Sequence, residues 1–387
     1  MDLRRLIVLA LALASACGPT PTPRVAVTPS GAATAATAAV SPSPQSSGTA
    51  EGVLLLTGQG QLGATTSTKY GLYVVGADGR IIRSATAGIQ SAGSYLPRFS
   101  VAGHSVYFLD GDQALKVFRG DGSVGAVAQL PGGPADRVVF AVSPDETRTA
   151  YSVIHFSGAG ATSASLRVGN LDGSNVHEIF SGPTIEFPVG WRAGQLVIAV
   201  TRSATPQNDG EVNPYWAVAY HVADPVTANR TFSTSPTCDE PSSLQGPVNG
   251  SGTVCQQNSD NSQIFLALGW NGSSRELFRT AVDGYKNAVP PAVLSPDGLR
   301  AAAGIAADHR ISLLSAGSAL PTAAVGTPAG WFDADHLLFM TAPCCQPLTG
   351  AAVLDVSSNK VTPVAAGLAG QADPYAPLFV SIPTDLV

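Results

Sequence analysis

From residue 53 onward the chain shows no long stretch with the periodicity of an amphipathic helix. Instead, short runs of Val, Leu, Ile, Phe and Tyr alternate with turn-forming residues about every 8–12 positions. Leu72–Val75, Leu115–Phe118 and Leu166–Val168 are examples of these runs. They have the length and the residue types of strands that are buried on one or both faces. The pattern predicts an all-β fold made of many short strands.

The turns between the runs recur at a spacing of about 40–55 residues, which is typical of repeat architectures such as β-propellers. One recurring turn is an Asp-Gly pair. Asp-Gly favours tight hairpins, so each pair is expected to join the two outer strands of a four-stranded blade. The four pairs are Asp78-Gly79, Asp121-Gly122, Asp172-Gly173 and Asp283-Gly284.

A second recurring turn has the sequence Ser-Pro-Asp and precedes an apolar strand. Proline fixes φ at the start of the turn, aspartate accepts a hydrogen bond from a downstream backbone N–H, and glycine permits positive φ. We expect this turn between the two inner strands of a blade. It occurs at Ser143-Pro144-Asp145 and Ser295-Pro296-Asp297-Gly298. The segment that begins with Phe99 fits the same frame, and those that begin with Trp191 and Trp331 fit it one residue short.

With these turns the chain resembles the TolB-like, WD-repeat-like β-propellers, whose blades carry a Trp-Ser-Pro-Asp-Gly turn before an apolar strand. The resemblance covers most of residues 53–369 and is sharp at the two Ser-Pro-Asp turns. It implies a ring of four-stranded blades and says little about chemistry, because one fold hosts many functions. Counted by the repeats, six blades span residues 95–136, 137–183, 184–236, 237–285, 286–325 and 326–369.

Residues 53–94 supply only the last strands of one further blade. Its first strand is expected at residues 377–382, near the C-terminus. Pairing of the two ends closes the ring and removes an exposed sheet edge. We therefore predict a β-propeller of seven blades over residues 51–387, with six or eight blades as alternatives because segment 237–285 fits the repeat poorly.

The first 16 residues have the features of a signal peptide. Arg4 and Arg5 precede the apolar run Leu6–Leu13, which is too short to span about 30 Å of hydrocarbon. The small residues that follow, ending in Cys17, resemble the bacterial lipobox, which implies cleavage after Ala16 and lipidation of Cys17. The alternative is ordinary secretion with cleavage after Ala16.

Residues 17–50 are expected to form a disordered tether between the lipid on Cys17 and the propeller. Of the 33 residues after Cys17, 28 are Ala, Pro, Thr, Ser or Gly, and the only charged residue is Arg24. A segment of this composition buries too little apolar surface to offset the entropy lost on ordering. The lipid would hold the protein on the extracytoplasmic side of a membrane in the cell envelope.

The charge balance of the remaining chain argues against two classes of partner. Outside the first 50 residues the chain carries 18 basic and 26 acidic residues, and the basic ones are scattered. This balance opposes binding of nucleic acid or of an anionic membrane surface by the folded part. Contact with the membrane is therefore expected through the lipid anchor alone.

Four cysteines remain after Cys17, an even number in an exported chain, where disulfides persist. Three pairings are possible. We favour Cys238 with Cys255, which bracket a polar segment, and Cys344 with its neighbour Cys345. Closing the first loop, of 17 residues, would contribute about 3 kcal/mol. Neither pair has the C-x₂-C spacing of a zinc site.

Sequence motifs identify no catalytic or metal site. The six histidines are scattered, and the chain lacks H-E-x-x-H, G-x-S-x-G, a P-loop and a G-x-G-x-x-G turn. Residues 208–213 offer oxygen ligands on alternate positions, as Ca²⁺ prefers, but the segment lacks the length of an EF-hand loop. No catalytic residue, metal or cofactor is predicted.

The sequence favours a non-catalytic scaffold that binds an envelope protein or a glycan. The binding surface would be looked for at segments 203–214 and 238–263, because they depart from the repeat. The first alternative is a propeller enzyme of the lactonase or glycosidase type, with acidic residues from different blades at the mouth of the central channel. The second is a structural or sensory module of a larger assembly, which predicts an exposed apolar patch.

Overall fold

The computed structural model describes residues 50–57, 69–90, 99–157, 160–201, 217–233, 240–241, 251–259, 261–281, 292–305, 308–341, 350–364 and 379–382. The chain divides into two units, Met1–Ser47 and Gly48–Val387, and all described residues belong to the second. The predicted signal peptide, Cys17 and the tether up to Thr49 lie outside the described residues. Within the described residues, no helix is long and apolar enough to cross a membrane.

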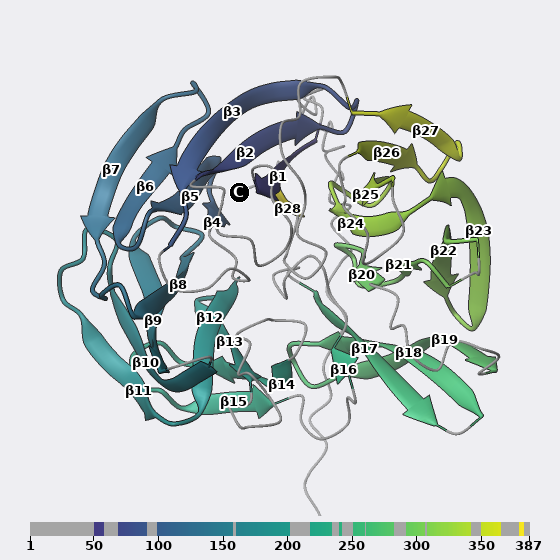
Figure 1. Cartoon of the computed structure of the whole chain (residues 1–387). Helices are drawn as coiled ribbons and strands as arrows, with labels where there is room; N and C mark the ends of the chain where they lie inside the picture. Colours follow the sequence, from purple (N-terminus) through teal and green to yellow (C-terminus); the bar gives the residue numbers. More distant parts are fainter. Residues whose placement is uncertain are drawn as a thin grey trace, which may run out of the picture. The chain divides into compact units, whose positions relative to one another are not determined.

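The described residues form 28 strands, which make seven antiparallel sheets of four strands arranged in a ring (Figure 1). In each sheet the strands follow one another from the centre of the ring to its periphery. This arrangement confirms the predicted all-β fold and the seven-bladed propeller.

In order from the inner to the outer strand, the first blade consists of β28 (Phe379–Ile382), β1 (Glu51–Thr57), β2 (Lys69–Gly76) and β3 (Ile81–Gly88). The second, in the same order, is β4 (Phe99–Ala102), β5 (Ser105–Asp110), β6 (Ala114–Phe118) and β7 (Val124–Gln129). The third is β8 (Asp136–Val142), β9 (Arg148–Ser157), β10 (Gly160–Asn170) and β11 (His177–Gly182).

The fourth blade is β12 (Ile185–Arg192), β13 (Gln195–Thr201), β14 (Ala217–Ala223) and β15 (Arg230–Ser233). The fifth is β16 (Glu240–Pro241), β17 (Gly252–Ser259), β18 (Ser262–Gly269) and β19 (Ser274–Ala281). The sixth is β20 (Ala292–Leu294), β21 (Ala301–Ala303), β22 (Arg310–Ser315) and β23 (Ser318–Val325). The seventh is β24 (Thr327–Trp331), β25 (His336–Met340), β26 (Ala351–Asp355) and β27 (Lys360–Pro363).

The two ends of the propeller sequence meet in the first blade. β28 pairs antiparallel with β1, with Val380 opposite Val53. The strand predicted at residues 377–382 is thus confirmed as the inner strand of this blade. Closure replaces two sheet edges, which would otherwise expose backbone N–H and C=O groups, with hydrogen-bonded strands.

The core lies between neighbouring blades. Val139 and Ile154 of the third blade form one buried cluster with Phe187 and Val197 of the fourth. Inner strands are covered on both faces, so successive residues are buried: residues 185–191 of β12 are all buried, and the one charged residue among them, Glu186, is paired with Arg230 at 2.7 Å. Outer strands such as β3 alternate between half-buried and exposed positions. This gradient explains why the first three strands of a blade give a clearer apolar signal than the outermost strand.

Two predictions about the fifth blade are corrected. Asp283-Gly284 lies outside the described residues, and the turn between the outer strands β18 and β19 is formed by Asn271-Gly272. The segment 238–263 is not an insertion throughout, because β17 occupies its second half. The strand was missed because its buried side chains include the polar Thr253 and Gln256, which mask the apolar pattern. The other three Asp-Gly pairs join outer strands as predicted.

Candidate functional site

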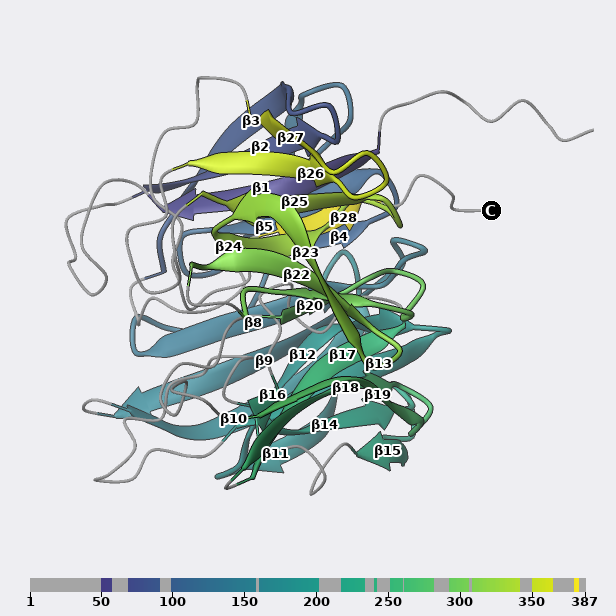
Figure 2. The same cartoon turned by 90° about the vertical axis from the view of Figure 1, so that its right-hand side faces the viewer.

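The ring has two faces, which the strand topology defines. Turns between first and second strands and between third and fourth strands lie at one end of each blade and make up the turn face. Connections between second and third strands and between successive blades lie at the opposite end and make up the loop face. Seen from the side, the blades run between these two ends (Figure 2).

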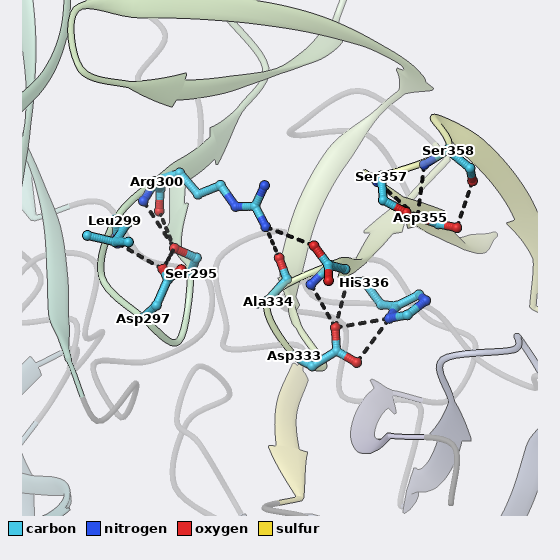
Figure 3. A network of polar contacts seen from close by, with 11 residues as sticks. Ser295, Asp297, Leu299, Arg300, Asp333, Ala334, His336, Asp355, Ser357 and Ser358 are labelled. Carbon is cyan, nitrogen blue, oxygen red and sulfur yellow. Dashed lines mark hydrogen bonds and ion pairs between the residues drawn. The ribbon is translucent and has the colours of Figure 1, made fainter. Parts of the chain in front are cut away.

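The two Ser-Pro-Asp turns lie on the turn face and share one hydrogen-bonding pattern. Ser143 Oγ donates to Asp145 Oδ1 at 2.5 Å and accepts from the Arg148 backbone N–H at 2.9 Å. Ser295 Oγ donates to Asp297 Oδ1 at 2.5 Å and accepts from the Arg300 N–H at 3.1 Å (Figure 3). Both serines are buried, which fixes the turns to the underlying strands.

The arginine that closes each turn contacts a tryptophan of the next blade. The Arg148 guanidinium lies 4.9 Å from the Trp191 ring centre, and the Arg300 guanidinium lies 5.4 Å from that of Trp331. Each indole N–H also donates, at 3.0 Å, to a carbonyl on the inner strand of the arginine's blade. The turn residues therefore hold neighbouring blades together, and their role is structural.

Asp-initiated turns also connect the outer strands on the turn face. Asp355 accepts hydrogen bonds from the hydroxyls and backbone N–H groups of Ser357 and Ser358 (Figure 3). These bonds, with those from the serine hydroxyls largest, hold the pKa of Asp355 well below its usual range. A hydrogen bond from Ser174 lowers the pKa of Asp172 in the same way. Each of these carboxylates stabilises its own turn, because its oxygens accept hydrogen bonds from residues of that turn.

The loop face carries a different feature, an open groove of about 500 Å³ on the third blade. It lies where the connection from β7 to β8 meets the side of the β8–β11 sheet. The residues that line it are Pro131, Gly132, Gly133, Asp136, Val153, His155, Ser163, Ala164, Ser165, Arg167 and Ser181. Most of the side chains in this set are polar, so the groove suits a polar ligand.

Asp136 organises one end of the groove. Its Oδ1 accepts a hydrogen bond from His155 Nδ1 at 2.8 Å, and its Oδ2 accepts from the Gly133 backbone N–H at 2.9 Å. The His155 side chain is 56% exposed, and the Asp136 side chain is 23% exposed. The carboxylate thus fixes the imidazole while leaving much of the ring accessible from the groove.

A second carboxylate organises the other end. Glu178 Oε2 accepts a hydrogen bond from Ser165 Oγ at 2.7 Å and lies 3.6 Å from Arg167 Nη2. Asp136 lines the groove beside His155, and Glu178, which is not a lining residue, contacts Arg167, so acidic and basic groups nearly balance in and next to the groove. The groove therefore presents hydroxyl, imidazole and guanidinium groups and has no strong net charge of either sign.

Sequence motifs did not identify this groove. Asp136, His155 and Ser163 are separated by 19 and 8 positions in the chain, and they come together only through strand register. The sequence does contain part of the pattern, because the lining residues Ser163, Ser165 and Arg167 alternate along β10. Recognising it requires knowing how the strands pair.

The predicted cysteine sites are covered only in part. Cys255 lies in β17 and is fully buried, whereas Cys17, Cys238, Cys344 and Cys345 lie outside the described residues. Both cysteine pairings stay predictions. Segments 203–214 and 208–213 also lie outside. In the part of the chain that the structure describes, no three His, Cys, Asp or Glu residues are grouped so as to hold a metal ion.

No protein family model and no curated protein matches the sequence. Solved structures with a similar fold include oligogalacturonate lyase from Vibrio parahaemolyticus, at 9% identity over 75% of this chain and 88% of that chain, with a TM-score of 0.47. TolB from Acinetobacter baumannii matches at 10% identity over 83% of this chain and 65% of that one, with a TM-score of 0.39. A periplasmic gluconolactonase from Pseudomonas aeruginosa matches at 14% identity over 86% of this chain and 100% of that one, with a TM-score of 0.45. The similarity is one of fold alone.

Proposed function

We propose that this protein is a lipid-anchored β-propeller of the bacterial cell envelope that binds an envelope protein or a glycan on the extracytoplasmic side. The observation that carries the binding role is the polar groove on the third blade. The lipobox-like residues before Cys17 and the Ala/Pro/Ser/Thr-rich tether support the anchored location. The propeller supplies a rigid support for the groove, since its strands are fixed by hydrogen bonds on both sides.

The groove is suited to a hydroxylated or peptide ligand. Ser163, Ser181 and Arg167 offer hydrogen-bond donors, and His155 offers either a donor or an acceptor. Two of the groups are already oriented by carboxylates, so less conformational entropy is lost when a ligand binds. The near balance of charge favours neutral polar ligands over polyanions such as nucleic acid.

Site-specific photo-crosslinking in intact cells tests the binding role. The photoreactive residue p-benzoylphenylalanine is placed at Ser181, in the groove, or at Ser174, an exposed position at the other end of the same blade. We expect an ultraviolet-dependent adduct from position 181 only, and its sensitivity to protease or to glycosidase distinguishes a protein from a glycan. Equal adducts from both positions, or none from either, would contradict a groove-centred binding function.

The anchor is tested separately with a metabolic fatty-acid label. Wild-type protein is expected to carry the label and to sediment with membranes, and the Cys17→Ser variant is expected to lose both properties. An unlabelled wild-type protein would contradict lipidation of Cys17 and favour the alternative of ordinary secretion. That result would remove the anchor from the proposal and leave the groove unaffected.

A further inference from the structure

Three residues of the groove form a row across neighbouring strands. His155 on β9 lies opposite Asp136 on β8 and opposite Ser163 on β10. Directly opposed residues of antiparallel strands have Cβ atoms about 4.5–5.5 Å apart, so His155 is a close neighbour of both. All three line the same groove, which places them on the same face of the sheet.

The orientation of the His155 ring is fixed by Asp136. A carboxylate only accepts hydrogen bonds, so the 2.8 Å contact places a proton on Nδ1 and leaves Nε2 as the basic nitrogen of the neutral ring. In imidazole, Nδ1 and Nε2 lie on opposite edges. Because Nδ1 bonds to Asp136 on β8, Nε2 is directed away from β8, and β10 with Ser163 is the neighbour of β9 on that side.

Asp136 is held in place as well. Its second oxygen accepts the Gly133 backbone N–H at 2.9 Å, so the carboxylate is fixed from the connection that precedes β8. Ser163 is half-buried, and its hydroxyl makes no hydrogen bond with any described residue. It lies one position beyond Ala164, the last residue of β10 at that end to pair with β11. The hydroxyl is therefore available to His155 Nε2 and to a molecule in the groove.

We propose that Ser163, His155 and Asp136 form a site that hydrolyses carboxylic esters bound in the groove. Ser163 Oγ attacks the carbonyl carbon, and His155 Nε2 takes the hydroxyl proton. As the bond to the leaving oxygen breaks, that proton passes to it and an alcohol departs, which leaves an acyl group on Ser163. Water then attacks the acyl carbon and gives a proton to His155. The bond between the acyl carbon and Ser163 Oγ then breaks, His155 returns its proton to that oxygen and the carboxylic acid leaves, so ester and water become acid and alcohol.

This inference rests on the proposed function in one respect, namely that a ligand occupies the groove. It goes beyond binding, because the bound ester is hydrolysed. The chain would then be an enzyme and not the non-catalytic scaffold that its sequence predicts. The roles are distinct: Ser163 is the nucleophile, His155 the general base and acid, and Asp136 a positioning residue that holds the ring and its tautomer.

The test uses the full-length protein, a fluorophosphonate probe and p-nitrophenyl acetate. The probe should phosphonylate Ser163 with loss of fluoride, as located by peptide mass spectrometry, and S163A should abolish both labelling and ester hydrolysis. H155A and D136N should slow hydrolysis about 100-fold or more. D136N should also shift the pH profile of the rate, which loss of a purely structural contact would not do. S174A, the same change at the far end of the blade, should leave the rate unchanged.

Thermal unfolding of each variant shows whether it folds like the wild type. Failure of native wild-type protein to react with the probe, or undiminished labelling in S163A, would overturn the hydrolase. The crosslink from position 181 separates the two proposals. A groove-specific crosslink without probe reaction overturns the hydrolase and leaves the binding function, whereas probe reaction at Ser163 without a crosslink supports the hydrolase and removes the macromolecular ligand.

Discussion

Trp191 donates its indole N–H to the carbonyl of Ala141, at 3.0 Å, across the boundary between the fourth and third blades. Trp331 repeats the contact with Val293, at the same distance, between the seventh and sixth blades. In both cases a tryptophan at the end of one inner strand bonds the inner strand of the preceding blade. The third and fourth blades, and likewise the sixth and seventh, are thus joined by the same type of hydrogen bond.

The first prediction concerns this contact. Trp191→Phe and Trp331→Phe keep an aromatic ring for the stacked arginine but leave a buried carbonyl without its donor. Each change should lower the free energy of unfolding by about 1–3 kcal/mol. Urea unfolding, followed by circular dichroism, measures the free energy of unfolding of each variant. An unchanged midpoint in both variants would show that the indole N–H contributes nothing at these blade boundaries.

The second prediction compares equivalent positions in the two Ser-Pro-Asp turns. Glu146 and Gly298 both have positive φ, of 56° and 71°. A side chain at such a φ costs roughly 1–2 kcal/mol. Glu146→Gly should therefore stabilise the protein by about 1 kcal/mol.

Gly298→Ala is the matched reverse change. Besides the strained φ, its Cβ would lie 3.1 Å from the Cβ of Ser251, so it should destabilise the protein by about 1 kcal/mol or more. Both variants are measured in the same urea titration. Effects of the same sign in the two turns would contradict the backbone explanation.

The fold was largely predictable because the repeat is built from local signals. Inner strands are covered on both faces, so they appear as apolar runs, and Asp-Gly and Ser-Pro-Asp turns mark where the chain reverses. The prediction failed where a buried strand carries polar side chains: Gln256 in β17 is fully buried. Burial of that residue depends on partners in neighbouring strands, which no local pattern contains.

The candidate site was not predictable in the same way. Asp136, His155 and Ser163 lie on three strands, and a shift of one residue in register would turn one of them to the other face of the sheet. β10 also has an irregularity between Ala161 and Ser163, which changes the alternation there. The row therefore follows from the three-dimensional register and not from the spacing of residues in the sequence.

The third prediction concerns the cysteines. Peptide mapping of the non-reduced protein should yield a linked pair that contains Cys238 and Cys255. Cys238→Ser should lower the free energy of unfolding by about 3 kcal/mol, because the unfolded chain regains the entropy of an open loop. A linked peptide that joins Cys255 to Cys344 or Cys345 would contradict this connectivity.

The fourth prediction concerns acid stability of the turn face. Hydrogen bonds from the Ser143 hydroxyl and from Ser358 and Ser357 lower the pKa of Asp145 and of Asp355. A carboxyl whose pKa is lower in the folded state stabilises the fold above its unfolded pKa, near 3.9, and loses that contribution as the pH falls through the folded value. The free energy of unfolding should therefore decrease as the pH drops below about 4.

Variants on the turn face separate these carboxylates from others in the chain. Asp355→Asn keeps an acceptor for Ser357 and Ser358 but cannot titrate, so unfolding free energy should vary less with pH between pH 5 and pH 2 than in the wild type, as about one proton fewer is taken up on unfolding. The fifth blade offers the opposite change, because Asn271 accepts from the Ser273 N–H where five of the other six blades have aspartate. Asn271→Asp should make stability more dependent on pH. Identical pH dependence in both variants and the wild type would show that these turns do not govern acid unfolding.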